Sequence, residues 1–239
     1  MIPLRDANPT RRPAVITLAI VIACSVAFAW ELGLSAGSGD AALNQAITTW
    51  GVVPARLTAA WAHGDYLSMD TATLVTSQFL HGGWLHLLGN MLYLWIFGNN
   101  VEDRMSRAGF LAFYLAGGIL AGLAQVAVDP TSTVPTIGAS GAIAATLGAY
   151  LIFFPGARVT SLIFLGFFYQ LINIPAAIVL GFWFVLQLVE GLGSLGVGQS
   201  GGGGVAFFAH IGGFVAGAAV AWLIGTAWSD RPGRARGVG

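Results

Sequence analysis

The sequence is poor in charge and contains no lysine. Only 8% of its 239 residues are charged, whereas soluble domains carry about 25%. Ten arginines balance ten acidic residues, so the formal net charge is zero. This shortage of charge excludes a disordered chain, a nucleic-acid-binding protein with a basic face and an ordinary water-soluble globule.

Cysteine is also scarce, because Cys24 is the only one in the chain. An intrachain disulfide and a cysteine-rich metal site are therefore excluded, and we predict no bound cofactor or metal. Hydrophobic residues instead make up 56% of the sequence, and 34 glycines accompany them. This composition predicts an integral protein of a lipid bilayer.

Six apolar segments approach the length of about 20 residues that a membrane-spanning helix needs. They are residues 14–34, 84–102, 108–128, 137–154, 174–190 and 205–227. We therefore predict an all-α polytopic membrane protein with one domain over residues 14–227, although five or seven spans remain open. The first segment could also be a cleaved signal peptide, but its length favours a retained helix.

Three connecting segments need their own interpretation. Residues 159–173 are apolar but short and are followed by Pro175, so they form either a connector or an extension of the fifth helix. Residues 35–80 form a long connection, rich in tryptophan and small residues, that we expect to be structured at the membrane interface. Residues 191–204 are rich in glycine and serine, which predicts a flexible linker.

The arginines divide unevenly between the two sides of such a membrane domain. Only Arg56 falls on the side of the 35–80 connection, and all the others fall on the side of the two termini. Those others are Arg5, Arg11, Arg12, Arg104, Arg107, Arg158, Arg231, Arg234 and Arg236. Because arginine is enriched in cytoplasmic loops, residues 1–13 and 228–239 are predicted to be cytoplasmic tails. A bacterial inner membrane is the simplest location.

A few polar side chains lie in or beside the spans, where each is a functional candidate because burial in lipid is costly. They are His81, His86 and Asn90 at the second span, Ser140 at the fourth and His210 in the sixth. All lie toward the non-cytoplasmic ends of their helices, so they could meet at one depth. Each also has a plain structural interpretation, as a group that hydrogen-bonds a neighbouring helix or its own backbone.

Ser140 and His210 together suggest nucleophilic catalysis. Ser140 begins a helix after Gly138, where unpaired N–H groups and the helix dipole stabilise negative charge. A serine hydroxyl needs an adjacent base, and His210 is the best-placed candidate. No carboxylate is positioned to complete a triad, so we predict a Ser–His dyad. His86 and Asn90 would then donate hydrogen bonds to the oxyanion.

Stripes of small residues predict that the fourth and sixth helices pack closely. On the sixth helix the stripe follows His210, at Gly213 and Gly217. A matching stripe on the fourth helix follows Ser140 and consists of Gly141, Ala145 and Ala149. Close packing of these two faces would bring Ser140 within reach of His210, although such stripes are common wherever membrane helices meet.

Four short motifs carry a resemblance to a known family. In chain order they are H-x4-H-x3-N (His81, His86, Asn90), E-x-R (Glu102, Arg104), G-x-S-G (Gly138–Gly141) and A-H-x-x-G-x-x-x-G (Ala209–Gly217). Over about residues 75–225 the sequence thereby resembles the rhomboid family of intramembrane serine proteases. Each motif is weak alone, but the ordered set is specific.

The resemblance implies a six-helix core that hydrolyses peptide bonds in or beside the transmembrane segments of other membrane proteins. It implies Ser140 as nucleophile, His210 as general base, and His86 and Asn90 in the oxyanion hole. His81 would have a structural role. The 35–80 connection would correspond to the family's membrane-embedded first loop, and residues 191–204 to its mobile cap.

The sequence departs from some family members in two places. It has no Trp-Arg pair near residues 60–80, and Ala144 stands where some members have a tyrosine that stacks on the catalytic histidine. Phe207 or Phe208 could supply that aromatic contact instead.

Two alternative functions remain open. One is a catalytically inactive rhomboid-like protein that binds membrane clients, against which only the presence of Ser140 and His210 argues. The other is a metal site or metal transporter built from His81, His86 and His210. The sequence offers that site no H-E-x-x-H motif and no carboxylate partner. The physiological substrate and the oligomeric state are not predicted.

Overall fold

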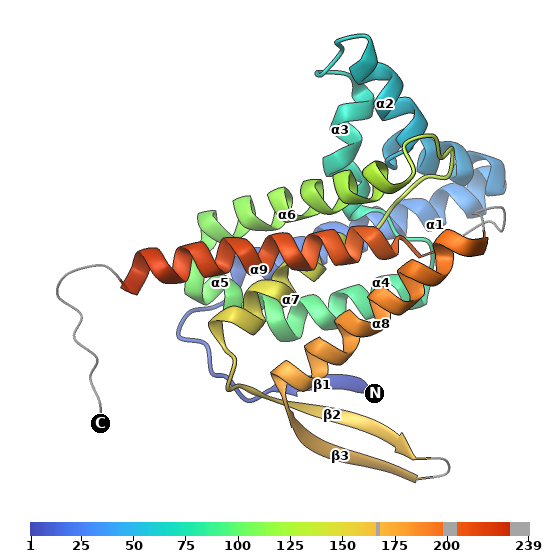
Figure 1. Cartoon of the computed structure of the whole chain (residues 1–239). Coiled ribbons are helices and arrows are strands. Elements are labelled where there is room, and N and C mark those ends of the chain that lie inside the picture. The colour runs from blue at the N-terminus through green and yellow to red at the C-terminus, as the bar shows by residue number, and fades with distance from the viewer. Residues whose placement is uncertain (166–167, 198–204, 230–239) are drawn as a thin grey trace, which may run out of the picture.

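The computed structural model describes residues 1–165, 168–197 and 205–229, and this part of the chain is mostly helical (Figure 1). The first long helix is α1 (Val15–Trp50). A continuous helical run follows, made of α4 (Trp84–Tyr93), the π-helical turn η2 (Leu94–Gly98) and α5 (Asn99–Met105). The remaining hydrophobic helices are α6 (Arg107–Val128), α7 (Ser140–Phe153), α8 (Ala176–Val197) and α9 (Phe207–Ser229). Within the described residues, α1, α6, α8 and α9 are each long and apolar enough to cross a membrane, and α7 is a shorter apolar helix. The predicted helical, polytopic membrane fold is therefore confirmed.

Helix α7 is the most deeply buried helix of the bundle, because every residue from Gly141 to Tyr150 is buried. Helix α9 approaches its backbone directly. A Cβ on Gly217 would collide with the carbonyl oxygen of Ala145, and a Cβ on Gly213 would collide with that of Gly141. The small residues on the two helices therefore face each other, and they set a short distance between the helix axes.

The segment 35–80 is helical over most of its length. Helix α1 continues through a kink at Gly39, where φ is 81°, and ends at Trp50. It is followed by α2 (Pro54–Ala62), α3 (Met69–Thr76) and the 3-10 turn η1 (Ser77–Phe79). Helices α2 and α3 project from one end of the bundle (Figure 1). An isolated bridge between Val52 and Thr136 ties this segment to the turn before α7.

A small antiparallel sheet, which is not predicted from the sequence, lies beside the helices. Its order is β1 (Ile2–Asp6), β2 (Arg158–Leu165), β3 (Phe168–Pro175). Residues 159–173 thus form a hairpin connector, and their interpretation as an extension of the fifth helix is wrong. The stretch is rich in β-branched and aromatic residues, which favour strands. The predicted N-terminal tail supplies β1, which pairs Ile2 with Leu162.

The two remaining predicted connections are partly helical. Residues 191–197, predicted as the start of a flexible linker, complete α8, and residues 198–204 lie outside the described residues. Helix α9 reaches Ser229, so the predicted tail 228–239 begins within it. Residues 230–239 also lie outside the described residues.

Polar contacts hold the start of α1 and strand β1 to the helices far from Ser140. Glu102 accepts hydrogen bonds from the N–H groups of Ile16 and Thr17, at 3.0 and 2.8 Å, and from the Thr17 hydroxyl at 2.9 Å. Its carboxylate thus caps the first turn of α1, where N–H groups lack helical partners.

Asp6 makes a second such contact. Its Oδ2 atom accepts hydrogen bonds from Asn100 Nδ2 at 2.7 Å and from the Tyr150 hydroxyl at 2.8 Å, which ties β1 to α5 and α7. We call the following residues the anchor cluster: Asp6, Thr17, Asn100, Glu102 and Tyr150.

Candidate active site

Ser140 is the first residue of α7 and follows a turn that only glycine can make. Gly138 has a φ of 125°, and its N–H donates to the Ser77 carbonyl oxygen at 2.9 Å. A Cβ on Gly138 would lie 2.7 Å from His86 Nε2 and 3.5 Å from Ser140 Oγ. The absent side chain therefore leaves room between the serine and His86.

His210 lies in the first turn of α9 and meets Ser140 across the α7–α9 contact. The distance from His210 Nε2 to Ser140 Oγ is 2.8 Å, and His210 is 9% exposed. Gly213 and Gly217 make this contact possible, because they have no side chain that would hold α9 away from the backbone of α7. The structure thus brings these two predicted residues within hydrogen-bonding distance.

His86 and Asn90 reach the same place from α4. His86 Nδ1 accepts a hydrogen bond from the Gly82 N–H at 3.3 Å, which leaves the ring proton on Nε2, beside Gly138. Asn90 lies one turn further along and is buried, and its Nδ2 group has no hydrogen-bond partner among the described residues. His86 Nε2 thus carries a proton beside Ser140, and Asn90 Nδ2 is a buried donor without a partner at the wall of the same cavity.

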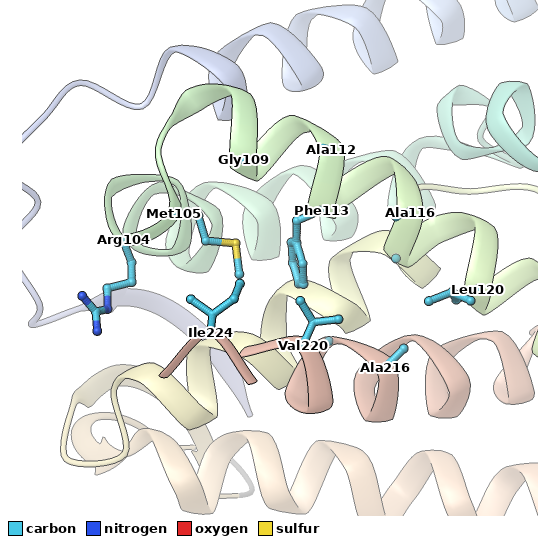
Figure 2. Close-up of a pocket in the computed structure, with 12 residues that line it drawn as sticks. Arg104, Met105, Gly109, Ala112, Phe113, Ala116, Leu120, Ala216, Val220 and Ile224 are labelled. Atoms are coloured by element: carbon cyan, nitrogen blue, oxygen red, sulfur yellow. The ribbon is translucent and has the colours of Figure 1, made fainter. Parts of the chain in front are cut away.

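All four side chains line one cavity of about 830 Å³. Its wall also includes Gly82, Pro135 and Thr136, from the turns before α4 and α7, and Trp183 from α8. A second, apolar cavity of about 360 Å³ lies between α6 and α9 (Figure 2). There Phe113 of α6 points toward Val220 of α9, and none of the predicted site residues lines it.

His81 lies beside these groups but has different partners. Its backbone N–H donates to both carboxylate oxygens of Glu31 at 3.2 Å, and its Nδ1 lies 3.1 Å from the Phe79 carbonyl oxygen. Its ring centroid is 5.2 Å from that of His86. Glu31 thus contacts the backbone of His81 and not its imidazole ring, so it is no carboxylate partner for the histidine side chains. Glu31 is buried in α1, and its place within an apolar span is the signal that could have revealed it.

Two residues of α8 contact His210 and were also missed. Gln187 Oε1 lies 2.6 Å from His210 Nδ1, in the place that a triad gives to a carboxylate. The Trp183 ring centroid lies 5.9 Å from that of His210. Trp183 therefore supplies the aromatic contact for which Phe207 and Phe208 are the sequence candidates, and these two residues line the cavity. A polar residue inside the apolar stretch 174–190 is the signal for Gln187.

Three acidic residues of α5 and α8 lie away from Ser140 and His210 and do not complete a triad. Glu102 caps α1, Asp103 forms an ion pair with Arg12 at 3.2 Å, and Glu190 is exposed on α8. Across the described ranges, no group of three or more histidine, cysteine, aspartate or glutamate residues is arranged to hold a metal ion. A metal centre made of His81, His86 and His210 therefore has no geometric support.

The fold and the site define a polytopic membrane protein with a serine–histidine pair at the wall of a cavity near the ends of its helices. A sequence profile of the Rhomboid domain matches residues 69–227. The chain belongs to the rhomboid family.

Its curated relatives are similar over parts of their length. The putative rhomboid protease YdcA of Bacillus subtilis (strain 168) is 36% identical over 103 residues, which is 38% of this chain and 51% of the relative. The rhomboid protease GluP of the same organism is 37% identical over 125 residues, 52% of this chain and 23% of the relative. The mitochondrial presenilin-associated rhomboid-like protein A of Danio rerio is 35% identical over 88 residues, 36% and 23% of the two chains. The chain thus spans about half or less of the length of these relatives.

Proposed function

We propose that this protein is an intramembrane serine endopeptidase that cleaves peptide bonds in or beside the transmembrane segments of other membrane proteins. The observation that carries the proposal is the 2.8 Å contact between Ser140 Oγ and His210 Nε2 at the wall of a cavity. Two relatives whose names include "rhomboid protease" give it independent support.

The proposed reaction uses the groups around Ser140 in two steps. His210 Nε2 takes the hydroxyl proton while Ser140 Oγ attacks the substrate carbonyl carbon, and the ring then gives that proton to the leaving amine. Water hydrolyses the resulting acyl-enzyme in the same way. In both steps the negative oxygen would accept hydrogen bonds from the Ser140 N–H, His86 Nε2 and Asn90 Nδ2.

The membrane setting imposes two further requirements. A peptide bond inside a helix is protected by its own hydrogen bonds, and the bilayer core holds no water. A substrate segment must therefore unwind, and it would do so in the cavity, where polar groups replace lost partners. In the proposed topology both termini are cytoplasmic, and the cavity lies near the opposite surface of a bacterial inner membrane. The nine-to-one distribution of arginines supports that orientation.

The test is labelling with a fluorophosphonate probe together with cleavage of a transmembrane substrate in liposomes. We expect the parent protein to do both and Ser140→Ala to do neither. Ser25→Ala is a matched control, because Ser25 is also in a hydrophobic helix but its hydroxyl bonds the Val21 carbonyl oxygen of its own helix. Full cleavage by purified Ser140→Ala would refute the proposal. A parent protein that binds substrate but is neither labelled nor active would instead be an inactive rhomboid-like binding protein.

A further inference from the structure

Helix α8 presents two side chains to the imidazole of His210. Trp183 and Gln187 are four residues apart and therefore lie on the same face of the helix. Trp183 packs beside the ring, and Gln187 Oε1 lies 2.6 Å from its Nδ1 atom. Gln187 is 8% exposed, so water competes little for this hydrogen bond.

A general base at His210 requires a proton on Nδ1 and a free lone pair on Nε2. A neutral imidazole carries one proton, and Nε2 can accept the Ser140 proton only when that one proton is on Nδ1. The amide oxygen of Gln187 is an acceptor without a proton of its own, so at 2.6 Å it favours the ring with Nδ1–H. With the amide oxygen facing the ring, the other tautomer would set two lone pairs against each other across this distance.

The geometry points to Gln187 as a positioning residue that holds His210 in the tautomer and orientation needed for a general base. This inference rests on the proposed function, since it assigns a task within the same site. Gln187 would occupy the place of the triad carboxylate, but as a neutral group. An amide adds no buried charge, which suits a hydrophobic helix in a membrane, where an unpaired carboxylate is costly.

The first test reads the tautomer itself by ¹⁵N NMR of histidine-labelled protein. In the parent protein we expect His210 to be protonated on Nδ1, and in Gln187→Met we expect a mixture of tautomers. Methionine keeps the length of the side chain but removes the acceptor oxygen. Gln125→Met is the matched control, because Gln125 is also buried and its Oε1 accepts from the Ala209 N–H at 3.3 Å, beside His210 but not on its ring. The control should leave the tautomer unchanged.

The second test separates positioning from folding. Gln187→Met should lower kcat about tenfold with little change in KM, the loss expected for one neutral hydrogen bond. Gln187→Glu keeps an acceptor oxygen at the same distance, so it should restore the Nδ1–H tautomer and most of the lost kcat. Rescue by glutamate would exclude a purely space-filling role for the side chain.

The outcomes distinguish this inference from the proposed function. If Ser140→Ala is inactive but Gln187→Met keeps the parent kcat and tautomer, the peptidase stands and the role of Gln187 is refuted. A parent His210 protonated on Nε2 would refute it as well. If Ser140→Ala remains active, the proposed function itself fails.

Discussion

Two polar clusters lie toward opposite ends of α7, one around Ser140 and one that includes Tyr150, and they differ in how their hydrogen bonds are used. In the anchor cluster, Glu102 accepts three hydrogen bonds and Asp6 accepts two, all from groups within the protein. Around Ser140, by contrast, Asn90 Nδ2 has no partner among the described residues and the groups line a cavity. The first arrangement is complete without a ligand, and the second is not.

A polar residue in a membrane-spanning helix is therefore not by itself evidence of a catalytic or binding role. Both clusters contain side chains that are costly to place in lipid. Satisfied hydrogen bonds point to a structural role, whereas open donors beside a cavity point to a ligand or a reacting group. We therefore expect substitutions in the anchor cluster to change stability and substitutions around Ser140 to change activity.

The largest effect should come from the dyad. His210→Ala should reduce cleavage by about 10⁴-fold or more and leave thermal stability close to that of the parent. The double variant Ser140→Ala/His210→Ala should be no less active than either single variant, because the two groups act as one unit. Cleavage rates and unfolding of purified protein in detergent measure both properties. Additive losses in the double variant would contradict a shared mechanism.

Asn90→Ala should have the next largest effect on activity. The open Nδ2 donor is expected to contribute to oxyanion binding, and loss of one such donor lowers kcat by about 10²–10³-fold in soluble proteases. KM should change little, because the interaction strengthens in the transition state. The control Asn173→Ala removes an exposed asparagine that accepts a hydrogen bond from Thr160 in the sheet. Parent kcat for Asn90→Ala would remove Asn90 from the site.

Glu102→Ala should show the opposite pattern. It leaves two N–H groups of α1 and one hydroxyl without their acceptor, which we expect to cost about 2–3 kcal/mol of stability. Activity per folded molecule should persist, because Glu102 lies far along the helix run from His86. Denaturation with SDS in mixed micelles measures the loss. Glu190→Ala is the control, since Glu190 is exposed on α8 and should change stability little. An inactive but stable Glu102→Ala protein would contradict the division between the clusters.

The sequence predicts the helical core well, because long apolar stretches of this length have few other structures available. It also singles out Ser140 and His210, which the structure brings within hydrogen-bonding distance, since polar groups stand out within apolar surroundings. The hairpin 158–175 is not predictable in the same way. Its strands are apolar on both faces, so they lack the alternation that distinguishes a strand from a short helix.

Partners of the site are harder to predict than its central residues. Gln187 and Glu31 contact residues that lie far from them in the sequence, 23 residues away at His210 and 50 away at His81. Only the packing of α8 on α9, and of α1 on the turn before α4, assigns each of them a partner. Trp183 is equally hidden, because an aromatic residue in a membrane helix is ordinary until its neighbour is known.

The smallest predicted effects concern the pH dependence of stability, which should differ between the carboxylates of Asp6 and Asp103. Burial raises the pKa of Asp6 above its ordinary value of 3.8, against the hydrogen bond from Tyr150. The hydrogen bond from the Arg11 N–H lowers the pKa of Asp103, and Arg12 lowers it further. The two carboxylates should therefore contribute to stability with opposite dependence on pH.

The folded protein binds the Asp6 proton more tightly than the unfolded chain does, so the stability that Asp6 contributes is complete below pH 3.8 and is lost as the pH rises through its raised pKa. The contribution of Asp103 is present above pH 3.8 and is lost as the pH falls through its lowered pKa. Stability curves between pH 3 and 7 for Asp6→Asn and Asp103→Asn, each subtracted from the parent, should slope in opposite directions. Parallel slopes would show that burial does not set the direction of the pKa shift of Asp6. The Asp6 carboxylate would then be held in its charged form by the hydrogen bonds from Asn100 and Tyr150, as Glu102 is held by the N–H groups of α1.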